Sequence, residues 1–113
     1  MKIILQELAI EELKQIAADT FGNLVKAVVD VKKEIIAVDA ELHSDLEALL
    51  LENGSKQGDL WGINFYPEAQ GIEFIEFDSM INMRPSQDNR SRGIESEEIR
   101  NKITEIASKR IKR

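Results

Sequence analysis

The chain has 113 residues, of which 42% are apolar and 32% are charged, a composition typical of a globular domain and not of a disordered segment. It contains no cysteine, which excludes disulfides, thiolate metal sites and a cysteine nucleophile. No apolar run approaches membrane-spanning length and nothing near the N-terminus is typical of a signal peptide, so we expect one cytoplasmic α+β domain over residues 1–113.

The net charge of -6 conceals an asymmetry along the chain. Residues 1–83 carry six lysines and sixteen acids, whereas residues 84–113 carry nine bases and five acids. An acidic body argues against a protein that coats nucleic acid, because such a protein needs an overall excess of base. The asymmetry permits a local anion site in the C-terminal part, or pairing between the two parts of the chain.

The first half of the chain predicts a strand, a helix and a hairpin. Lys2–Leu5 is a short apolar run, and residues 11–21 carry apolar side chains at helical spacing, ended by Gly22. The valine-rich run Leu24–Val31 and the run Ile35–Leu42 are separated by a short polar link, which predicts an antiparallel pair of strands.

A short helix follows this hairpin. Ser44, with Glu47 three residues later, forms a capping-box pattern, and Asn53-Gly54 is typical of a helix end. We therefore expect the helix to begin after Ser44, and the preceding strand to end at about Leu42.

The second half predicts another hairpin and a last helix. Leu60–Tyr66 and Ile72–Asp78 are the two strands, with Ser79–Met83 as a prolongation of the second, and Ser96 caps the final helix. The order β-α-β-β-α-β-β-α predicts an α+β fold with a mainly antiparallel sheet and helices packed on it.

The stretch Met83–Ile94 concentrates the unexplained basic chemistry. No arginine precedes it, and within it three arginines alternate with hydroxyl and amide side chains. Guanidinium groups bind phosphate or carboxylate through a planar fork, and neighbouring hydroxyls and amides can complete an anion site. We therefore predict that this loop binds an anionic ligand through Arg84, Ser86, Asn89, Arg90, Ser91 and Arg92. The competing interpretation is an exposed loop whose arginines pair with the acidic body.

A second candidate group surrounds the only histidine of the chain. If the strand continues through His43, then Asp39, Glu41 and His43 share one face, and Asp45 follows in the first helical turn. One imidazole with neighbouring carboxylates suits either acid–base chemistry or a divalent metal. We take His43 and Glu41 as candidate catalytic residues and assign no metal; a residue next to a helix cap can also serve as a local hydrogen-bond partner.

A third group, at the start of the second hairpin, consists of Asp59, Trp61, Asn64 and Tyr66. Trp61 alternates with Ile63 and Phe65, which is the pattern of a half-buried strand, so we assign Trp61 to the core. Asn64 lies on the opposite face, where a role in ligand binding stays open. Signatures of serine hydrolases, dinucleotide-binding folds and phosphate-binding loops are absent.

Four stretches carry a resemblance to a known family: Ala27–Val31, Glu41–Asp45, Gly54–Pro67 and, as the most specific one, Phe74–Ile94. Through them nearly the whole chain resembles a small prokaryotic family catalogued as a domain of unknown function. The resemblance implies a stand-alone bacterial or archaeal protein of about this length. It implies no activity, cofactor or catalytic residue.

Two functional hypotheses follow from the sequence. In the first, the domain binds a phosphate-bearing small molecule or nucleotide through the arginine loop, and His43 acts only if the fold brings it beside that loop. In the second, a non-enzymatic homodimer or regulatory module uses the loop to bind an acidic protein surface. No cofactor is indicated, and membranes and nucleic acid are not expected partners.

Overall fold

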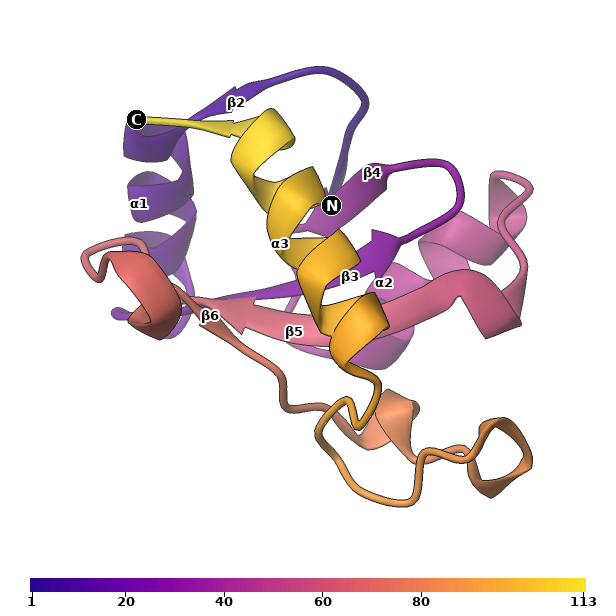
Figure 1. Cartoon of the computed structure of the whole chain (residues 1–113). Helices are drawn as coiled ribbons and strands as arrows, with labels where there is room; N and C mark the ends of the chain where they lie inside the picture. The colour runs from indigo at the N-terminus through magenta and orange to yellow at the C-terminus, as the bar shows by residue number, and fades with distance from the viewer.

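A five-stranded sheet forms the centre of the structure, a computed structural model that describes residues 1–113 (Figure 1). Each neighbouring pair of strands is antiparallel, and the strands lie in the order β1 (Lys2–Ile4), β4 (Ile35–Val38), β3 (Val25–Asp30), β5 (Leu60–Phe65) and β6 (Ile75–Glu76). The predicted α+β fold with a mainly antiparallel sheet is therefore confirmed.

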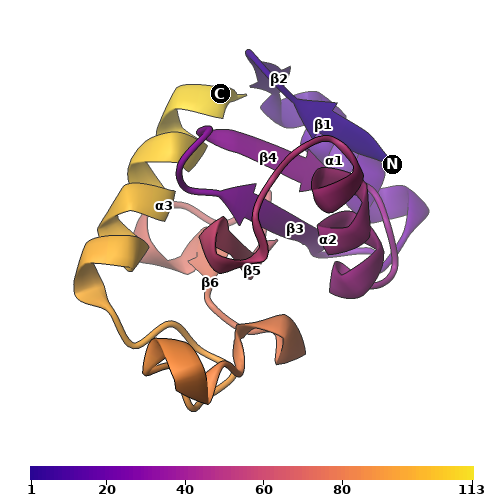
Figure 2. The ribbon, with the colours of Figure 1, turned by 90° about the vertical axis from the view of Figure 1, so that its right-hand side faces the viewer.

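Helices cover both faces of this sheet, as the side view in Figure 2 shows. The helices α1 (Ile10–Asp19) and α3 (Glu97–Arg110) pack on one face, where the larger core of 19 buried residues lies. The helix α2 (His43–Glu52) packs on the other face through Leu46 and Leu50. Because the sheet is covered on both sides, alternate residues of β3 and β5 enter different cores.

A small second sheet joins two segments that lie near opposite ends of the chain. Strand β2 (Leu8–Ala9) pairs in parallel with β7 (Ile111–Lys112), next to the helices α1 and α3 (Figure 1). The sequence did not predict this pair, since two-residue strands leave no periodic pattern. Four single 3₁₀ turns complete the chain: η1 (Gln57–Asp59), η2 (Gly71–Glu73), η3 (Met80–Asn82) and η4 (Pro85–Gln87).

The predicted start of α2 is two residues too late, since the N-cap is Leu42 and not Ser44. Strand β4 ends at Val38 because Asp39 adopts a positive φ of 74°, which interrupts an extended backbone. The helix then begins at His43 after Leu42, so Ser44 lies inside the first turn and forms no cap. Consequently Asp39, Glu41 and His43 do not share a strand face.

The predicted second hairpin is confirmed, but it is short. Strand β6 pairs with β5 over only two residues, and Ser79–Met83 does not prolong it. Instead the side chain of Asn82 occupies the edge of β5: its Oδ1 accepts from the Gly62 N–H at 2.8 Å, and its Nδ2 donates to the Gly62 carbonyl at 2.9 Å. Position 62 must be glycine, because a Cβ there would lie 2.5 Å from the Cβ of Ser79.

The last helix is confirmed with its predicted cap, since the Ser96 Oγ accepts from the Ile99 N–H at 3.2 Å. Its bases bind the turn between β3 and β4: the Nζ atoms of Lys102 and Lys109 lie 2.8 and 3.1 Å from the Glu34 carboxylate. The C-terminal excess of base is thus largely paired within the chain. None of the helices combines the length and apolarity that crossing a membrane requires.

Candidate functional site

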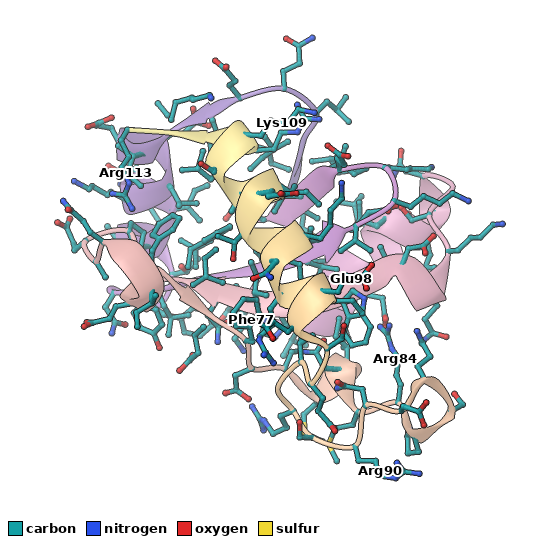
Figure 3. The ribbon with its side chains drawn as sticks, viewed as in Figure 1. Phe77, Arg84, Arg90, Glu98, Lys109 and Arg113 are labelled. Atoms are coloured by element: carbon teal, nitrogen blue, oxygen red, sulfur yellow. The ribbon has the colours of Figure 1, made fainter.

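Arg84, the first arginine of the predicted anion-binding loop, is buried against the body of the protein. Figure 3 shows its side chain directed back toward the sheet. Its Nη2 donates to the Glu47 carboxylate at 3.3 Å, and its guanidinium lies 4.9 Å from the Trp61 ring centroid. Burial lowers the pKa of Arg84, while the charge of Glu47 opposes that shift. Its Nε and Nη1 are buried without a hydrogen-bond partner.

Asn89 holds the loop in shape instead of facing solvent. It is 3% exposed, its Nδ2 donates to the carbonyls of Asn82, Ser91 and Gly93, and its Oδ1 accepts from the Glu95 N–H. The Glu95 carboxylate in turn accepts from two backbone N–H groups of the loop, those of Arg90 and Ser91. Some of the polar side chains from which a ligand site was predicted thus stabilise the loop through hydrogen bonds to its own backbone.

The remaining predicted residues of the loop lie on its surface. Ser86 is exposed in η4, and the Arg90 side chain extends from the far tip of the loop, away from the sheet (Figure 3). Arg92 turns toward the sheet, where its Nε lies 2.7 Å from Asp78 Oδ1. The hydrogen bond with Asp78 and its charge raise the pKa of Arg92.

Arg92 and His43 line one groove, which we call the α2 groove. It has a volume of about 520 Å³ and lies between the first turn of α2, the adjoining face of the sheet and the segment that follows β6. Its lining consists of Phe21, Leu24, Lys26, Leu42, His43, Ser44, Asn64, Tyr66, Glu76, Asp78, Ser79, Met80, Ile81 and Arg92. One predicted catalytic residue and one predicted anion-binding residue are therefore brought together.

The floor of the groove is a row of three polar side chains on adjacent strands. Lys26 of β3 is paired with Asn64 of β5, and Asn64 with Glu76 of β6, so the three side chains share one face. Asn64 Nδ2 donates to Glu76 Oε1 at 2.9 Å and also to the Asp78 carbonyl at 3.5 Å. The Tyr66 hydroxyl donates to the same Glu76 oxygen at 3.1 Å.

The Asn64 amide leaves one acceptor without a partner. Both groups that face its nitrogen can only accept, which fixes the orientation of the amide. Its Oδ1 is then buried with no hydrogen bond, and the residue as a whole is only 6% exposed. Such an atom is uncommon in folded proteins and calls for a donor from outside the chain, either a water molecule or a ligand.

His43 contributes a neutral imidazole to the groove. Its Nε2 lies 2.8 Å from the Ile63 carbonyl, which can only accept, so this nitrogen carries the proton. Burial lowers the pKa of His43, and this effect outweighs the hydrogen bond to Ile63 that raises it. Lys26 and Asp78 are near enough to act on the same pKa with opposite signs. The lone pair of the neutral ring is therefore on Nδ1, and the Asn64 side chain is close enough to His43 to raise its pKa as a hydrogen-bond partner.

The rim of the groove is apolar. Phe21, Leu42 and Met80 are 42%, 54% and 62% exposed, and all three line the groove. The Lys26 ammonium lies 5.0 Å from the Phe21 ring centroid, which places this charge next to the rim. A concave site with an apolar rim and a few polar groups on its floor is the usual form of a small-molecule site.

The first turn of α2 adds backbone donors at the same place. Leu42 supplies no side-chain cap, and in the first turn the Asp45 N–H donates to the Leu42 carbonyl at 3.2 Å. Leu42, His43 and Ser44 line the groove, and a helix N-terminus attracts anions. Asp45, in the same turn, carries the opposite charge and reduces this attraction.

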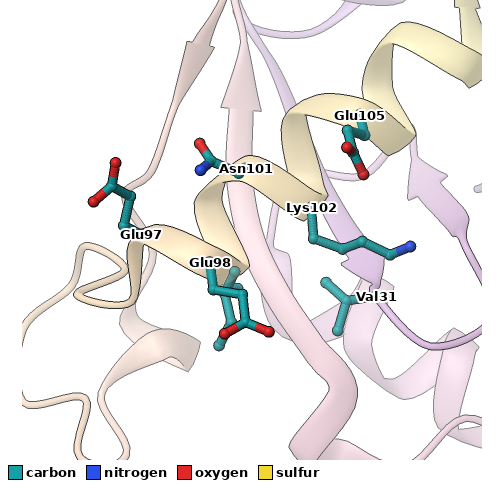
Figure 4. A pocket seen from close by; sticks show the side chains of 7 residues that line it. Val31, Glu97, Glu98, Asn101, Lys102 and Glu105 are labelled. Atoms are coloured by element: carbon teal, nitrogen blue, oxygen red, sulfur yellow. The ribbon is translucent and has the colours of Figure 1, made fainter.

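A larger hollow of about 660 Å³ lies elsewhere, along the first turns of α3 (Figure 4). Its polar lining is dominated by the carboxylates of Glu97, Glu98 and Glu105, and its single base, Lys102, is bound to Glu34. This hollow contains no unpaired buried group and no histidine. We therefore place the candidate site in the smaller α2 groove.

Glu41, the other predicted catalytic residue, is exposed and does not line the groove. No group of three or more histidine, aspartate and glutamate side chains is arranged to hold a metal ion, so Glu41, His43 and Asp45 form no such cluster. The sequence missed Lys26, Glu76 and Asp78 as residues of the site. Alternation along a strand puts Lys26 on the face opposite Val25 and Ala27, but only the register of three strands shows which residues lie beside it.

Comparison with known proteins identifies the family. Residues 2–110 match the family described as protein of unknown function (DUF5674), so the chain belongs to it and the resemblance found in the sequence is confirmed. No curated protein and no solved structure matches the chain.

Proposed function

We propose that this member of the DUF5674 family binds a small organic anion in the α2 groove. One observation supports the proposal most: Arg92, Lys26 and the uncapped first turn of α2 line the same concave site. Each of these is a group that binds phosphate or carboxylate, and together they surround a floor that contains an unsatisfied amide oxygen. The apolar rim favours a ligand with an organic part next to its charge.

The ligand is the anion that the sequence predicts, but of the three arginines in the loop only Arg92 lines the groove. Arg84 is engaged with Glu47, and Arg90 extends away from the sheet, so neither lines the groove. Arg92 is bound to Asp78, yet its side chain is 54% exposed and the ion pair is solvated. A solvated pair contributes little by itself, about 0.5 kcal/mol, so a ligand anion can compete for the guanidinium.

His43 gives this site a base as well as a binding group. A neutral imidazole with its Nε2 proton engaged presents Nδ1 as a proton acceptor, which is the form that general-base catalysis requires. We propose His43 as the residue that would accept a proton from the bound ligand. Glu41, at its exposed position, has no contact through which to assist.

The binding proposal is tested by calorimetric titration of phosphorylated and carboxylated metabolites, including nucleotides, against four proteins. Wild type is expected to bind at least one probe, and Arg92→Gln and Lys26→Gln to bind it at least tenfold more weakly. Arg90→Gln is the matched control, because it removes the same charge from the same loop but outside the groove, and its affinity should stay that of wild type. Loss of binding in Arg90→Gln alone would move the site to the tip of the loop.

A second candidate function rests on Arg90. It is exposed at the tip of the loop, and its side chain forms no ion pair in the structure, unlike those of Arg84 and Arg92. The alternative is a regulatory module in which Arg90 binds an acidic surface of a second copy. Sedimentation of wild type and Arg90→Glu at low and high salt tests it; a wild-type protein that stays monomeric at all concentrations contradicts it.

A further inference from the structure

We propose that the ligand of the α2 groove is a zwitterion, whose anionic group faces Lys26 and Arg92 and whose primary ammonium faces Asn64, Glu76 and His43. This inference rests on the proposed function, since it places a second charge on the same ligand. Several hydrogen-bond acceptors of the groove would stay unused if the ligand were only an anion, because an anion provides no donor to satisfy them.

The first acceptor is Asn64 Oδ1. It is buried without a partner, and the orientation of the amide is fixed because Nδ2 faces a carboxylate and a carbonyl. Reversing the amide would therefore lose two hydrogen bonds, because its oxygen would then face the Glu76 carboxylate and the Asp78 carbonyl, which can only accept. An unpaired buried acceptor costs about 1–3 kcal/mol, so a ligand that supplies a donor recovers this free energy on binding.

The second acceptor is the carboxylate of Glu76. Its Oε1 accepts from Asn64 and from the Tyr66 hydroxyl, whereas Oε2 accepts no hydrogen bond within the chain. No lysine or arginine lies within ion-pair distance of this carboxylate, although Lys26 is two strands away on the same face. Glu76 is exposed, and its carboxylate is accessible to a cation in the groove.

The third acceptor is His43 Nδ1. Its lone pair is free because Nε2 carries the proton, and the ring lines the groove close enough to Asn64 for that amide to act on its pKa. The residues of all three acceptors line the same groove, and a primary ammonium suits them because it has three N–H donors in a compact group. A hydroxyl has one donor, and a quaternary ammonium has none.

The experiment compares zwitterions with analogues that lack one charge. L-leucine is titrated beside 4-methylpentanoate, which lacks the ammonium, and isopentylamine, which lacks the carboxylate. O-phosphoethanolamine is titrated beside ethyl phosphate, so the two series also distinguish a carboxylate from a phosphate as the anionic group. We expect L-leucine to bind at least tenfold more tightly than both of its analogues, or O-phosphoethanolamine to bind at least tenfold more tightly than ethyl phosphate.

Two variants assign the effect to the floor of the groove. Glu76→Gln should bring the zwitterion and its anionic analogue within about threefold of each other, while Glu73→Gln, an equal charge change outside the groove, should preserve the difference. Equal affinity of wild type for a zwitterion and for its anionic analogue overturns the zwitterion but leaves the anion site standing. If none of the probes binds, the zwitterion is overturned together with the groove as its site.

Discussion

Arg84 reaches across the edge of the sheet to Glu47, at 3.3 Å, although 37 positions separate the two residues in the chain. This ion pair attaches the arginine loop to α2, the helix whose first turn contains His43. Its side chains are 9% and 14% exposed, so both charges are largely removed from water. The loop and the helix that border the α2 groove therefore share one buried contact.

A double-mutant cycle measures that contact. Glu47→Met leaves the buried Arg84 guanidinium without its counter-charge and should lower the free energy of unfolding by about 3 kcal/mol. The double variant Arg84→Met/Glu47→Met replaces both charges with apolar side chains and should be more stable than Glu47→Met alone. Urea unfolding followed by circular dichroism gives all four stabilities. Simple additivity of the two substitutions would show that the pair contributes nothing.

Asn82→Ala should loosen the arginine loop from the sheet. The substitution removes both hydrogen bonds to the Gly62 backbone and the one to the Arg92 carbonyl, and it leaves edge groups of β5 unpaired. We expect a loss of about 2 kcal/mol in stability, and faster hydrogen exchange at Gly62 than in wild type. Asn53→Ala is the control, because Asn53 bonds only the end of its own helix. Unchanged exchange at Gly62 would refute the role of Asn82 as a substitute strand.

His43 should make stability depend on pH near neutrality. Burial holds its folded-state pKa below the ordinary value of 6.5, so at pH values between the two the unfolded chain binds more protons. The contribution of His43 is therefore complete above pH 6.5 and is lost as the pH falls through the folded-state pKa. Thermal unfolding of wild type and His43→Gln from pH 5 to 8 should show a slope in wild type that the variant lacks. Parallel curves would contradict a depressed pKa.

Glu34 should act in the acid range with the same sign. The hydrogen bonds from Lys102 and Lys109, with their charges, lower the pKa of Glu34 from 4.5 to about 2. Its stabilising contribution is full above pH 4.5 and is lost as the pH falls toward 2. Glu34→Gln should therefore flatten the decline of stability between pH 4.5 and 2, as measured by acid titration of circular dichroism. Glu73→Gln, a carboxylate with no ion pair, is expected to retain the decline of wild type.

Sequence patterns correctly predicted the helices and strands that are determined by neighbouring residues in the chain. The last helix begins after Ser96 because that hydroxyl caps it, and the valine-rich run of β3 alternates as a strand does. The start of α2 was missed because the backbone of Asp39, with its positive φ, ends β4 early, and no residue type at that position announces such a turn. The role of Asn82 was missed, because a single side chain that pairs with the edge of a strand leaves no periodic pattern of apolar residues in the sequence.

The candidate site was predicted only in part, for a related reason. His43 and Arg92 were selected by their chemistry, and the fold brings both to the α2 groove. The row of Lys26, Asn64 and Glu76 depends on how three strands are aligned, which is a long-range property that composition and spacing do not contain. Arg84 and Asn89 were assigned to a ligand because many hydrogen-bond donors in a short stretch can bind either a ligand or other groups of the protein. In the structure, Arg84 binds Glu47 and Asn89 binds the loop backbone.

The pairing of β2 with β7 has a consequence for how the chain acquires its structure during synthesis. Leu8 lies beside Ile111, and α3, which immediately precedes β7, covers the larger of the two cores. A nascent chain that has not yet released α3 exposes the apolar face of β3 and β5 and can complete only the side covered by α2. The larger core can therefore close only after α3 and β7 have been synthesised, as expected for a topology that joins distant segments.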